Sequence, residues 1–209
     1  FVRLKKNGGE FSFRKIQGKG KKVYEANITL FNAFEKSDFD KKGKYFLERF
    51  ISAHAIMLAF EGIPAVYFNS IFGTSNDNSK YIISGNKRDL NRYRWNKVRL
   101  EKSLKNKNSK QTIYYKNMTN LLKVRKKQKA FHPDAAQTTL KLGSKIFAIK
   151  RLSIDKKQSI TCLTNVTSKK QFVNLNINKD KFKNLLQDKL MLVNKKLELK
   201  PFQTVWISN

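Results

Sequence analysis

Apolar residues recur at helical spacing over residues 45–60, which read YFLERFISAHAIMLAF. Phe46, Phe50 and Met57 would share one face of such a helix, and several alanines would widen that face. The pattern therefore predicts an amphipathic helix. A similar repeat, interrupted by more polar residues, predicts a second helix over residues 111–129.

The segment after the first helix changes character twice. Residues 63–69, IPAVYFN, form a short apolar run that predicts a strand buried on both faces. Such strands belong to parallel sheets with helices outside, so this helix and strand are typical of a βα repeat. The polar run 69–78 follows directly, where the loops of a barrel carry functional residues.

From residue 137 onward the apolar residues alternate with a period of two. Short segments of this kind, separated by turn residues, predict the strands of a small antiparallel β-sandwich. The segments are TTLKLG, KIFAIKRL, SITCLTNVT, QFVNLNI and LELKPFQTVWIS. Residues 179–188 are expected to form a helical turn or a connecting loop.

These elements predict an α/β region followed by a β-domain. Residues 1–135 are expected to be the C-terminal portion of a (β/α)₈ TIM barrel, and residues 136–209 the β-domain. A complete barrel needs about 250 residues, so further strands are expected upstream of Phe1. The glycine-punctuated start of the chain predicts a frayed helix end and a loop. Residues 71–110 are expected to be an irregular connection.

Positive charge dominates the composition. Among 209 residues, 45 lysines and arginines oppose 15 aspartates and glutamates, a formal net charge of +30. A nucleic-acid or anionic-membrane partner would explain this charge. The lysines, however, occur in nearly every segment and accompany abundant asparagine, as a coding bias would leave them. A dedicated binding face would concentrate them among stacking aromatic residues, so nucleic acid is the less favoured partner.

Other chemistry is sparse. No apolar run approaches the length of about 18 residues that a membrane span needs, so no membrane partner is expected. Cys162 is the single cysteine and the N-terminus lacks the apolar core of a secretory signal, so a cytoplasmic location is expected. His54 is interpreted as a core residue, and His132, before Pro133, as part of a helix stop. One cysteine and two histidines, far apart in the sequence, do not have the spacing of metal ligands, so no metal site and no cofactor are predicted.

Five segments, taken in order, resemble the α-amylase superfamily and most closely its group of sucrose and glucosylglycerate phosphorylases. GIPAVYFNS resembles the superfamily's last barrel strand, and YEANITLFNAF resembles a loop and helix start of the phosphorylases. SGNKRDLNRYRW resembles their Gly-Arg-Asp-Ile-Asn-Arg segment. LLKVRKKQKAFHPDA and LKPFQTVWIS resemble the last barrel helix and the end of the β-domain. The set covers essentially the whole chain.

The resemblance implies reversible transfer of an α-glucosyl group between sucrose or glucosylglycerate and phosphate, which gives α-glucose 1-phosphate. It implies a retaining mechanism with an Asp nucleophile, a Glu acid and a third, stabilising Asp. In the family these carboxylates lie upstream of the matched segments. No residue is therefore assigned a catalytic role, and the chain alone is expected to be inactive. The acids considered and set aside are Asp38, Asp40, Asp77, Asp89 and Asp134.

The resemblance also implies residues that bind substrate. Arg92 matches the arginine that holds the glucosyl unit, and an arginine fork suits sugar hydroxyls. Arg88 and Asp89 are expected to brace this loop through a local ion pair. Asn76 and Asp77 are expected to shape the acceptor side of the pocket.

Tyr24 and Glu25 match a mobile acceptor loop of the family. The family pattern Asp-Leu-Tyr-Gln is replaced here by Lys22-Val23-Tyr24-Glu25, so a lysine stands for an acid and a glutamate for an amide. A basic residue suits an anionic acceptor such as glycerate, or phosphate itself. The alternative is that Lys22 is one more solvated lysine.

We therefore predict a glycoside phosphorylase whose partners are a sugar or glucoside substrate and inorganic phosphate. The pattern indicates no particular oligomeric state. A hydrolase of the same superfamily, of the α-glucosidase or amylase type, is the close alternative. A basic nucleic-acid-binding module is the alternative from another class, and salt-sensitive retention on heparin would favour it.

Overall fold

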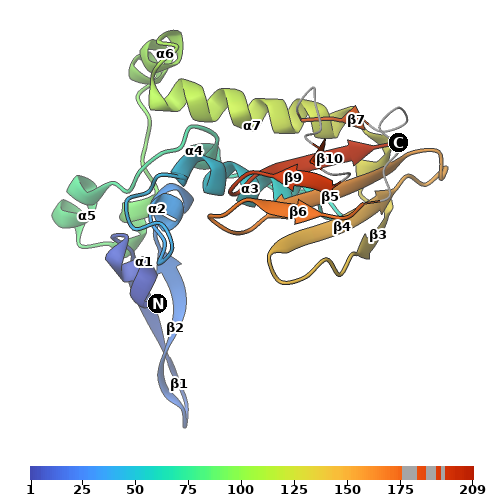
Figure 1. Ribbon diagram of the computed structural model, residues 1–209. Coiled ribbons are helices and arrows are strands. Elements are labelled where there is room, and N and C mark those ends of the chain that lie inside the picture. Colours follow the sequence, from blue (N-terminus) through green and yellow to red (C-terminus); the bar gives the residue numbers. More distant parts are fainter. Residues whose placement is uncertain (176–182, 187–191, 194–195) are drawn as a thin grey trace. The chain divides into compact units, whose positions relative to one another are not determined.

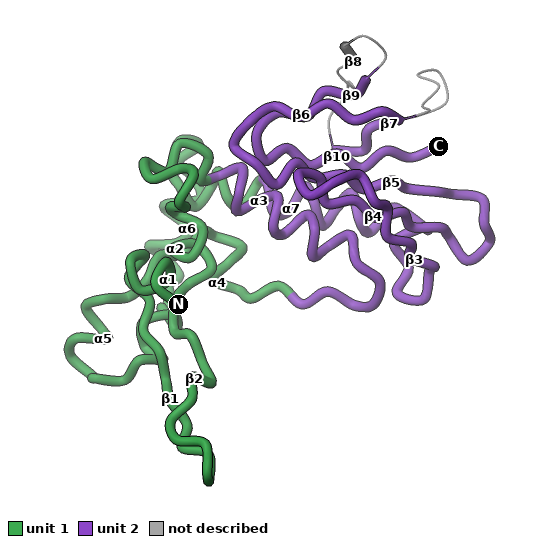
Figure 2. Tube along the Cα trace, turned by 60° about the horizontal axis from the view of Figure 1, so that its bottom comes forward, with its two compact units in different colours: residues 1–46, 66–116 green, residues 47–65, 117–209 purple. Residues whose placement is uncertain are grey.

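The structure is a computed structural model that describes residues 1–175, 183–186, 192–193 and 196–209 (Figure 1). The chain divides into two compact units, coloured separately in Figure 2. Unit 1 comprises residues 1–46 and 66–116, and unit 2 comprises residues 47–65 and 117–209. Each unit thus combines two stretches of the chain, whereas the sequence pattern predicts one boundary after residue 135. The division into a barrel portion and a β-domain stays a prediction.

Unit 1 begins with a short helix and a β-hairpin. Helix α1 spans Val2–Lys6, and strands β1 (Glu10–Ile16) and β2 (Gly20–Asn27) pair antiparallel. Gly18 and Gly20 have φ angles of 73° and 71°, which side chains rarely adopt, so these glycines build a tight turn. The loop expected in this region is therefore wrong. Lysines on both strands conceal the alternation that would have indicated a hairpin.

Short helices make up most of the rest of unit 1. They are α2 (Leu30–Glu35), α4 (Phe68–Ile71), α5 (Asn78–Ser84), the 3₁₀ helix η1 (Lys87–Asn91) and α6 (Lys97–Lys105). Polar side chains accept hydrogen bonds from backbone N–H groups at several of their N-termini: Thr29, Asp77, Asn86 and Asn96. The connection expected to be irregular over residues 71–110 contains helices because its polar residues serve as caps.

Aromatic side chains form the interior of unit 1. The rings of Phe31 and Tyr114 meet edge to face with centroids 5.3 Å apart, and Phe72 stacks on Tyr115 at 5.5 Å. Gly73 lies against the Tyr114 ring, where an added Cβ would come within 2.6 Å of a ring carbon. Gly73 also has a left-handed φ of 56°. Only glycine suits this position, where the backbone lies directly against the aromatic cluster.

Unit 2 contains two antiparallel sheets. The five-stranded sheet has the order β3-β4-β5-β10-β7, with β3 (Ala136–Thr139), β4 (Ile146–Leu152), β5 (Ser159–Asn165), β10 (Thr204–Ser208) and β7 (Lys183–Asn184). The three-stranded sheet has the order β6-β9-β8, with β6 (Gln171–Val173), β9 (Lys196–Leu199) and β8 (Leu192–Val193). The period-two pattern predicts such antiparallel strands. Of residues 179–188, where a helical turn or a connecting loop is expected, the structure describes 183–186. Lys183–Asn184 there form strand β7 instead, because they pair with β10, and the rest of the range lies outside the described residues.

Both sheets contribute to one apolar core. Leu163 on β5, Val205 on β10 and Leu199 on β9 are buried in the same cluster. Their neighbours in it are Ile146, Ala148, Val173, Leu197 and Ile207. Alternate residues of each strand enter this core, which is why the sequence pattern of these strands is so regular.

Helix α3 (Phe46–Ala59) lies where the sequence predicts a helix, and so does α7 (Lys110–Lys126), which contributes residues to both units. In unit 2, two buried arginines hold the C-terminal end of α3. Arg151 donates to the carbonyl of Ala59 at 2.8 Å, and Arg125 donates to the carbonyls of Leu58 and Gly62. Cations at the end of a helix satisfy its last carbonyls and oppose its dipole. None of the described helices is long and apolar enough to cross a membrane.

The strand expected over residues 63–69 is wrong. Residues 63–67 have no regular secondary structure, and Phe68 begins helix α4. Ile63 and Tyr67 are 86% and 54% exposed, so the segment is not buried either. A strand needs neighbours for its backbone groups, and no other described strand pairs with this segment. The apolar run by itself could not supply that partner.

Candidate substrate-binding site

All the residues that the sequence nominates for binding lie in unit 1. Lys22, Tyr24 and Glu25 are on strand β2. Arg88 and Asp89 are on η1, and Arg92 follows its last residue. Asn76 and Asp77 immediately precede α5. The candidate site is therefore built from the hairpin, η1 and the loop before α5.

The hairpin and η1 are joined by an ion pair between two of these residues. The Nε of Arg88 donates to Oε2 of Glu25 at 2.9 Å, and this bond raises the pKa of Arg88. Lys87 adds a second link, since its Nζ donates to the carbonyl oxygen of Phe11 at 2.6 Å. The structure thus brings together Glu25 and Arg88, which are far apart in the sequence.

The expected ion pair between Arg88 and Asp89 is wrong. Asp89 pairs instead with Lys80, whose Nζ lies 2.8 Å from Oδ1, and hydrogen bonds from Lys80 and Ser84 lower the pKa of Asp89. Consecutive residues of a 3₁₀ helix point about 120° apart. Arg88 therefore reaches strand β2, while Asp89 reaches the first turn of α5.

A β-bulge sets the direction of Lys22, Tyr24 and Glu25 on strand β2. Ser12 is opposite Glu25 and Phe13 is opposite Val23, so Tyr24 is an extra residue without a partner across the hairpin. Side chains directly opposite each other share a face of the ladder, and the bulge therefore places Lys22 and Glu25 on the same face. Tyr24 itself is 56% exposed.

Asn76 is the centre of a hydrogen-bond network. Its Oδ1 accepts from the backbone N–H of Thr29 at 2.8 Å and from the Thr29 hydroxyl at 3.0 Å. Its Nδ2 donates to the carbonyl of Gly8 at 3.0 Å, and its own N–H donates to Oδ1 of Asn32 at 2.8 Å. With its side chain engaged in this way, Asn76 positions the loop.

Asp77 caps helix α5. Its Oδ1 accepts from the backbone N–H of Lys80 at 3.0 Å, and its own N–H donates to the carbonyl of Leu90 at 2.7 Å. Other acids have similar structural partners: the carboxylate of Asp40 accepts from the backbone N–H groups of Lys44 and Tyr45. These contacts give Asp77 and Asp40 structural roles.

Arg92 is exposed at the C-terminal end of η1. Its N–H donates to the carbonyl of Asp89 at 3.4 Å, while its guanidinium makes no hydrogen bond or ion pair with the described residues. The group is therefore available to a ligand. Among the described residues, no three His, Cys, Asp or Glu side chains gather in a way that could hold a metal ion.

The two histidines and the cysteine take no part in this site. His54 is buried in α3 and its Nδ1 donates to the Phe50 carbonyl at 2.8 Å, which confirms a core histidine; burial lowers its pKa. Cys162 is buried in β5, and burial raises the pKa of its thiol. His132 is exposed just after the 3₁₀ helix η2 (Lys129–Phe131).

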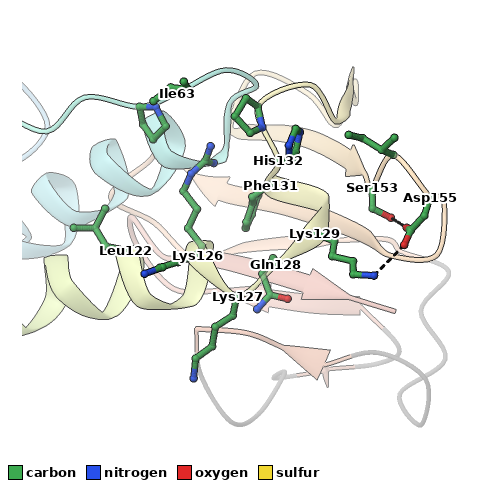
Figure 3. A pocket seen from close by; sticks show the side chains of 14 residues that line it. Ile63, Leu122, Lys126, Lys127, Gln128, Lys129, Phe131, His132, Ser153 and Asp155 are labelled. Atoms are coloured by element: carbon green, nitrogen blue, oxygen red, sulfur yellow. Dashed lines mark hydrogen bonds and ion pairs between the residues drawn. The ribbon is translucent and has the colours of Figure 1, made fainter.

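Unit 2 has a separate hollow of about 850 Å³, drawn in Figure 3. Apolar side chains such as Ile63 and Phe131 and basic ones such as Lys126 line it. Its one carboxylate, Asp155, accepts a hydrogen bond from Ser153 at 2.6 Å, which with Lys157 N–H and Lys129 lowers the pKa of Asp155 to about 2. None of the residues nominated from the sequence lies in this hollow.

No protein-family model matches the sequence. The glucosylglycerate phosphorylase of Allomeiothermus silvanus is 34% identical over 184 residues, which are 88% of this chain and 31% of that protein. The glucosylglycerate phosphorylase of Escherichia coli is 30% identical over 185 residues, 88% of this chain and 32% of that protein. The chain is related to the phosphorylase group of the α-amylase superfamily. The resemblance that rests on five sequence segments is thereby confirmed. The chain spans about a third of the length of these relatives.

Solved structures of the superfamily share the fold. The sucrose 6F-phosphate phosphorylase from Thermoanaerobacter thermosaccharolyticum superposes with a TM-score of 0.62 at 16% identity, over 78% of this chain and 30% of that one. The trehalose-6-phosphate hydrolase of Bacillus licheniformis superposes with a TM-score of 0.58 at 16% identity, over 82% of this chain and 40% of that one. These neighbours are (β/α)₈ barrel enzymes. At such identities the likeness concerns the fold alone.

Arg14 is a residue of this region that the sequence reasoning missed. It lies on β1 directly opposite Lys22. The turn held a usable signal, because the two closely spaced glycines of Gln-Gly-Lys-Gly can close a hairpin. Pairing of the two stretches across this turn places Arg14 opposite Lys22.

Proposed function

We propose that this chain is part of a glycoside phosphorylase that transfers an α-glucosyl group from glucosylglycerate to inorganic phosphate. The products would be α-glucose 1-phosphate and glycerate. The observation that carries the proposal is the 34% identity over 184 residues with a glucosylglycerate phosphorylase. Sucrose is the second donor to test, because the sequence segments resemble sucrose phosphorylases as well.

The proposed reaction retains configuration in two displacements. A carboxylate attacks the anomeric carbon and the glycosidic bond breaks, while a carboxylic acid protonates the leaving oxygen. A phosphate oxygen then attacks the same carbon from the side of the departed group and releases the carboxylate. None of the acids in this chain is assigned to either role, so the chain by itself is proposed to be inactive and to contribute binding residues and scaffold.

Within this scheme, Arg92 is proposed to hold hydroxyl groups of the glucosyl unit. Its exposed guanidinium supports this role, because it makes no hydrogen bond with the described residues. Lys22, Tyr24, Glu25 and Arg88 are proposed to face the acceptor. The ion pair of Glu25 with Arg88 would keep this part of the hairpin in place.

The proposed fold is part of a barrel followed by a β-domain. Residues 1–135 would supply barrel helices, among them α3 and α7, and residues 136–209 the β-domain. The likeness to barrel enzymes over about 80% of the chain supports this proposal.

The test uses a longer protein that contains this chain and is active. We expect it to form glucose 1-phosphate from glucosylglycerate and phosphate faster than it forms glucose. Arg92→Lys keeps the charge but loses the planar fork, so kcat/KM should fall about 10- to 150-fold for every donor. Arg99→Lys, at an exposed position of α6, is the matched control and should change little.

Two results would contradict the proposal. Release of glucose without glucose 1-phosphate would identify a hydrolase instead. Equal rates for Arg92→Lys and the parent protein would show that the match over residues 85–95 does not mark a sugar-binding arginine.

A further inference from the structure

The β1–β2 hairpin opposes cations across its ladder at two successive positions. Arg14 is directly opposite Lys22, and Lys15 is directly opposite Lys21 (Figure 1 shows the hairpin). Partners of this kind have neighbouring side chains on one face, and like charges there destabilise the pairing. Successive residues of a strand point to opposite faces, so each face of the hairpin carries one cation pair. Such a local conflict in a folded protein calls for a compensating interaction.

The acids of the hairpin do not supply that compensation. Glu10 is paired with Lys5, and Glu25 is paired with Arg88. Between Phe11 and Tyr24 the sequence contains no aspartate or glutamate. Both cation pairs therefore keep a surplus of positive charge.

The two faces differ in their other groups. The face of Arg14 and Lys22 also carries Glu25, because the bulge at Tyr24 shifts the register, and Glu25 brings Arg88 to that face. This face therefore carries the pair Arg14 and Lys22 and, at the next position on it, the ion pair of Glu25 with Arg88.

The opposite face carries Lys15 and Lys21 next to the apolar pair Phe13 and Val23. The Nζ of Lys87 lies 5.8 Å from the centre of the Phe13 ring and is engaged with the Phe11 carbonyl. Its cation pair consists of two lysines and contains no arginine guanidinium. Variants of Lys15 and Lys21 can therefore serve as controls for variants of Arg14 and Lys22.

We propose that Arg14 and Lys22, flanked by Arg88, form a binding site for a small oxyanion, and that inorganic phosphate is the ligand. The inference rests on the proposed function, in which phosphate is the acceptor. It adds Arg14 as a residue that determines acceptor specificity. The planar fork of Arg14 can hold two oxygens of one phosphate, while Lys22 adds a point charge opposite it.

The carboxylate of glycerate is also a small oxyanion and could bind the same cations. The two anions are distinguished by titrating the 209-residue chain with phosphate and with glycerate separately, at constant ionic strength adjusted with chloride. Backbone amide NMR shifts of the hairpin report binding. The proposal expects shifts around Arg14 and Lys22 that saturate with phosphate at lower concentration than with glycerate. Saturation by glycerate alone would overturn the assignment of phosphate.

Two double variants make the decisive comparison. R14Q/K22Q and K15Q/K21Q remove the same charge from adjacent positions and relieve the same repulsion, but on opposite faces. R14Q/K22Q should weaken phosphate binding about three- to tenfold, which is the scale for two solvent-exposed ion pairs. K15Q/K21Q should change it less than about twofold, the effect expected from net charge alone. Equal weakening by both variants, or by neither, would overturn the proposal.

Binding of a single-stranded oligonucleotide tests whether the hairpin is instead a surface that binds polyanions. Binding that is tighter than that of phosphate, falls steeply with salt and weakens equally in both double variants would overturn the small-anion site in favour of nucleic acid. Failure of an oligonucleotide to displace phosphate from Arg14 and Lys22 would support the site.

The longer active protein separates this inference from the proposed function. There, R14Q/K22Q should raise the KM for phosphate about three- to tenfold, and K15Q/K21Q should leave it unchanged. Phosphate binding at Arg14 and Lys22 without any formation of glucose 1-phosphate would sink the proposed function but keep the site. Phosphorolysis with an unaltered KM in R14Q/K22Q would keep the function and sink the site.

Discussion

Unit 2 is stabilised mainly by apolar burial, whereas unit 1 depends on aromatic contacts and hydrogen bonds between polar side chains. Leu163, Leu199 and Trp206 of unit 2 are completely buried in its sheets. The described hydrophobic side chains that are buried in unit 1 are Phe31, Phe72, Leu90 and Tyr114. Unit 1 adds capped helices and the network around Asn76. The nominated binding residues all belong to unit 1.

This difference suits a division between scaffold and site. Apolar burial is non-directional and needs only size and shape, so it yields a stable sheet packing. Side-chain hydrogen bonds are directional, so they can place a loop accurately while leaving groups such as Arg92 exposed to a ligand.

The largest effect is expected in the core of unit 2. Trp206 is fully buried on β10, and its ring meets Phe131 with centroids 4.7 Å apart. Trp206→Ala removes a large apolar side chain and leaves a cavity, so it should lower the free energy of unfolding by about 3–5 kcal/mol. Urea unfolding followed by circular dichroism measures the change. Phe172→Ala, at a position 52% exposed on β6, should cost about 0.5 kcal/mol or less. Equal costs would mean that apolar burial does not dominate unit 2.

A smaller effect is expected in the network of unit 1. Asn76→Ala removes an acceptor for two hydrogen bonds from Thr29 and a donor to the Gly8 carbonyl. Leaving these groups unsatisfied should cost about 1–3 kcal/mol, with faster hydrogen exchange at the amides of unit 1 than of unit 2. Asn78→Ala, at an exposed position in the first turn of α5, is the control and should stay within about 0.5 kcal/mol. Unchanged hydrogen exchange of the unit 1 amides in Asn76→Ala would show that Asn76 does not hold its loop in position.

The smallest effect concerns pH and His54. Burial lowers the pKa of His54 below its ordinary value of 6.5, so the unfolded chain takes up a proton at a higher pH than the folded one. Above pH 6.5, protonation of His54 therefore does not reduce the free energy of unfolding. As pH falls from 6.5 toward the folded pKa, the unfolded chain binds the proton first, and the free energy of unfolding decreases. Unfolding free energies measured between pH 7.5 and 5 should decrease less in His54→Leu than in the parent chain. A dependence that survives His54→Leu would assign it to other groups.

Much of the fold could be read from periodicity. The helical repeat over residues 45–60 corresponds to α3, and the alternation after residue 137 corresponds to the strands of the two sheets. These patterns are strong because one face of each element is buried in its own unit. The ordered sequence segments indicated the phosphorylase group, which the relatives confirmed.

Other features of the fold are not predicted by the sequence pattern, for physical reasons. The apolar run over residues 63–69 is not a strand, because a strand exists only with a hydrogen-bonding neighbour. The sequence predicts a loop where the β1–β2 hairpin lies, because lysines occupy both faces of the hairpin and obscure its apolar alternation. The pairing of Arg88 with Glu25 joins residues that are remote in sequence, and proximity along the chain suggested Asp89 instead.

Local order and spacing along the chain specify the amphipathic helices, the antiparallel strands after residue 137 and the relationship to the phosphorylase group. Which polar residues meet depends on the three-dimensional structure. It placed Glu25 beside Arg88, Asn76 among Thr29 and Gly8, and Arg14 opposite Lys22. Contacts of this kind depend on the register of a hairpin and on the packing of distant helices, and a one-residue bulge is enough to change which side chains share a face.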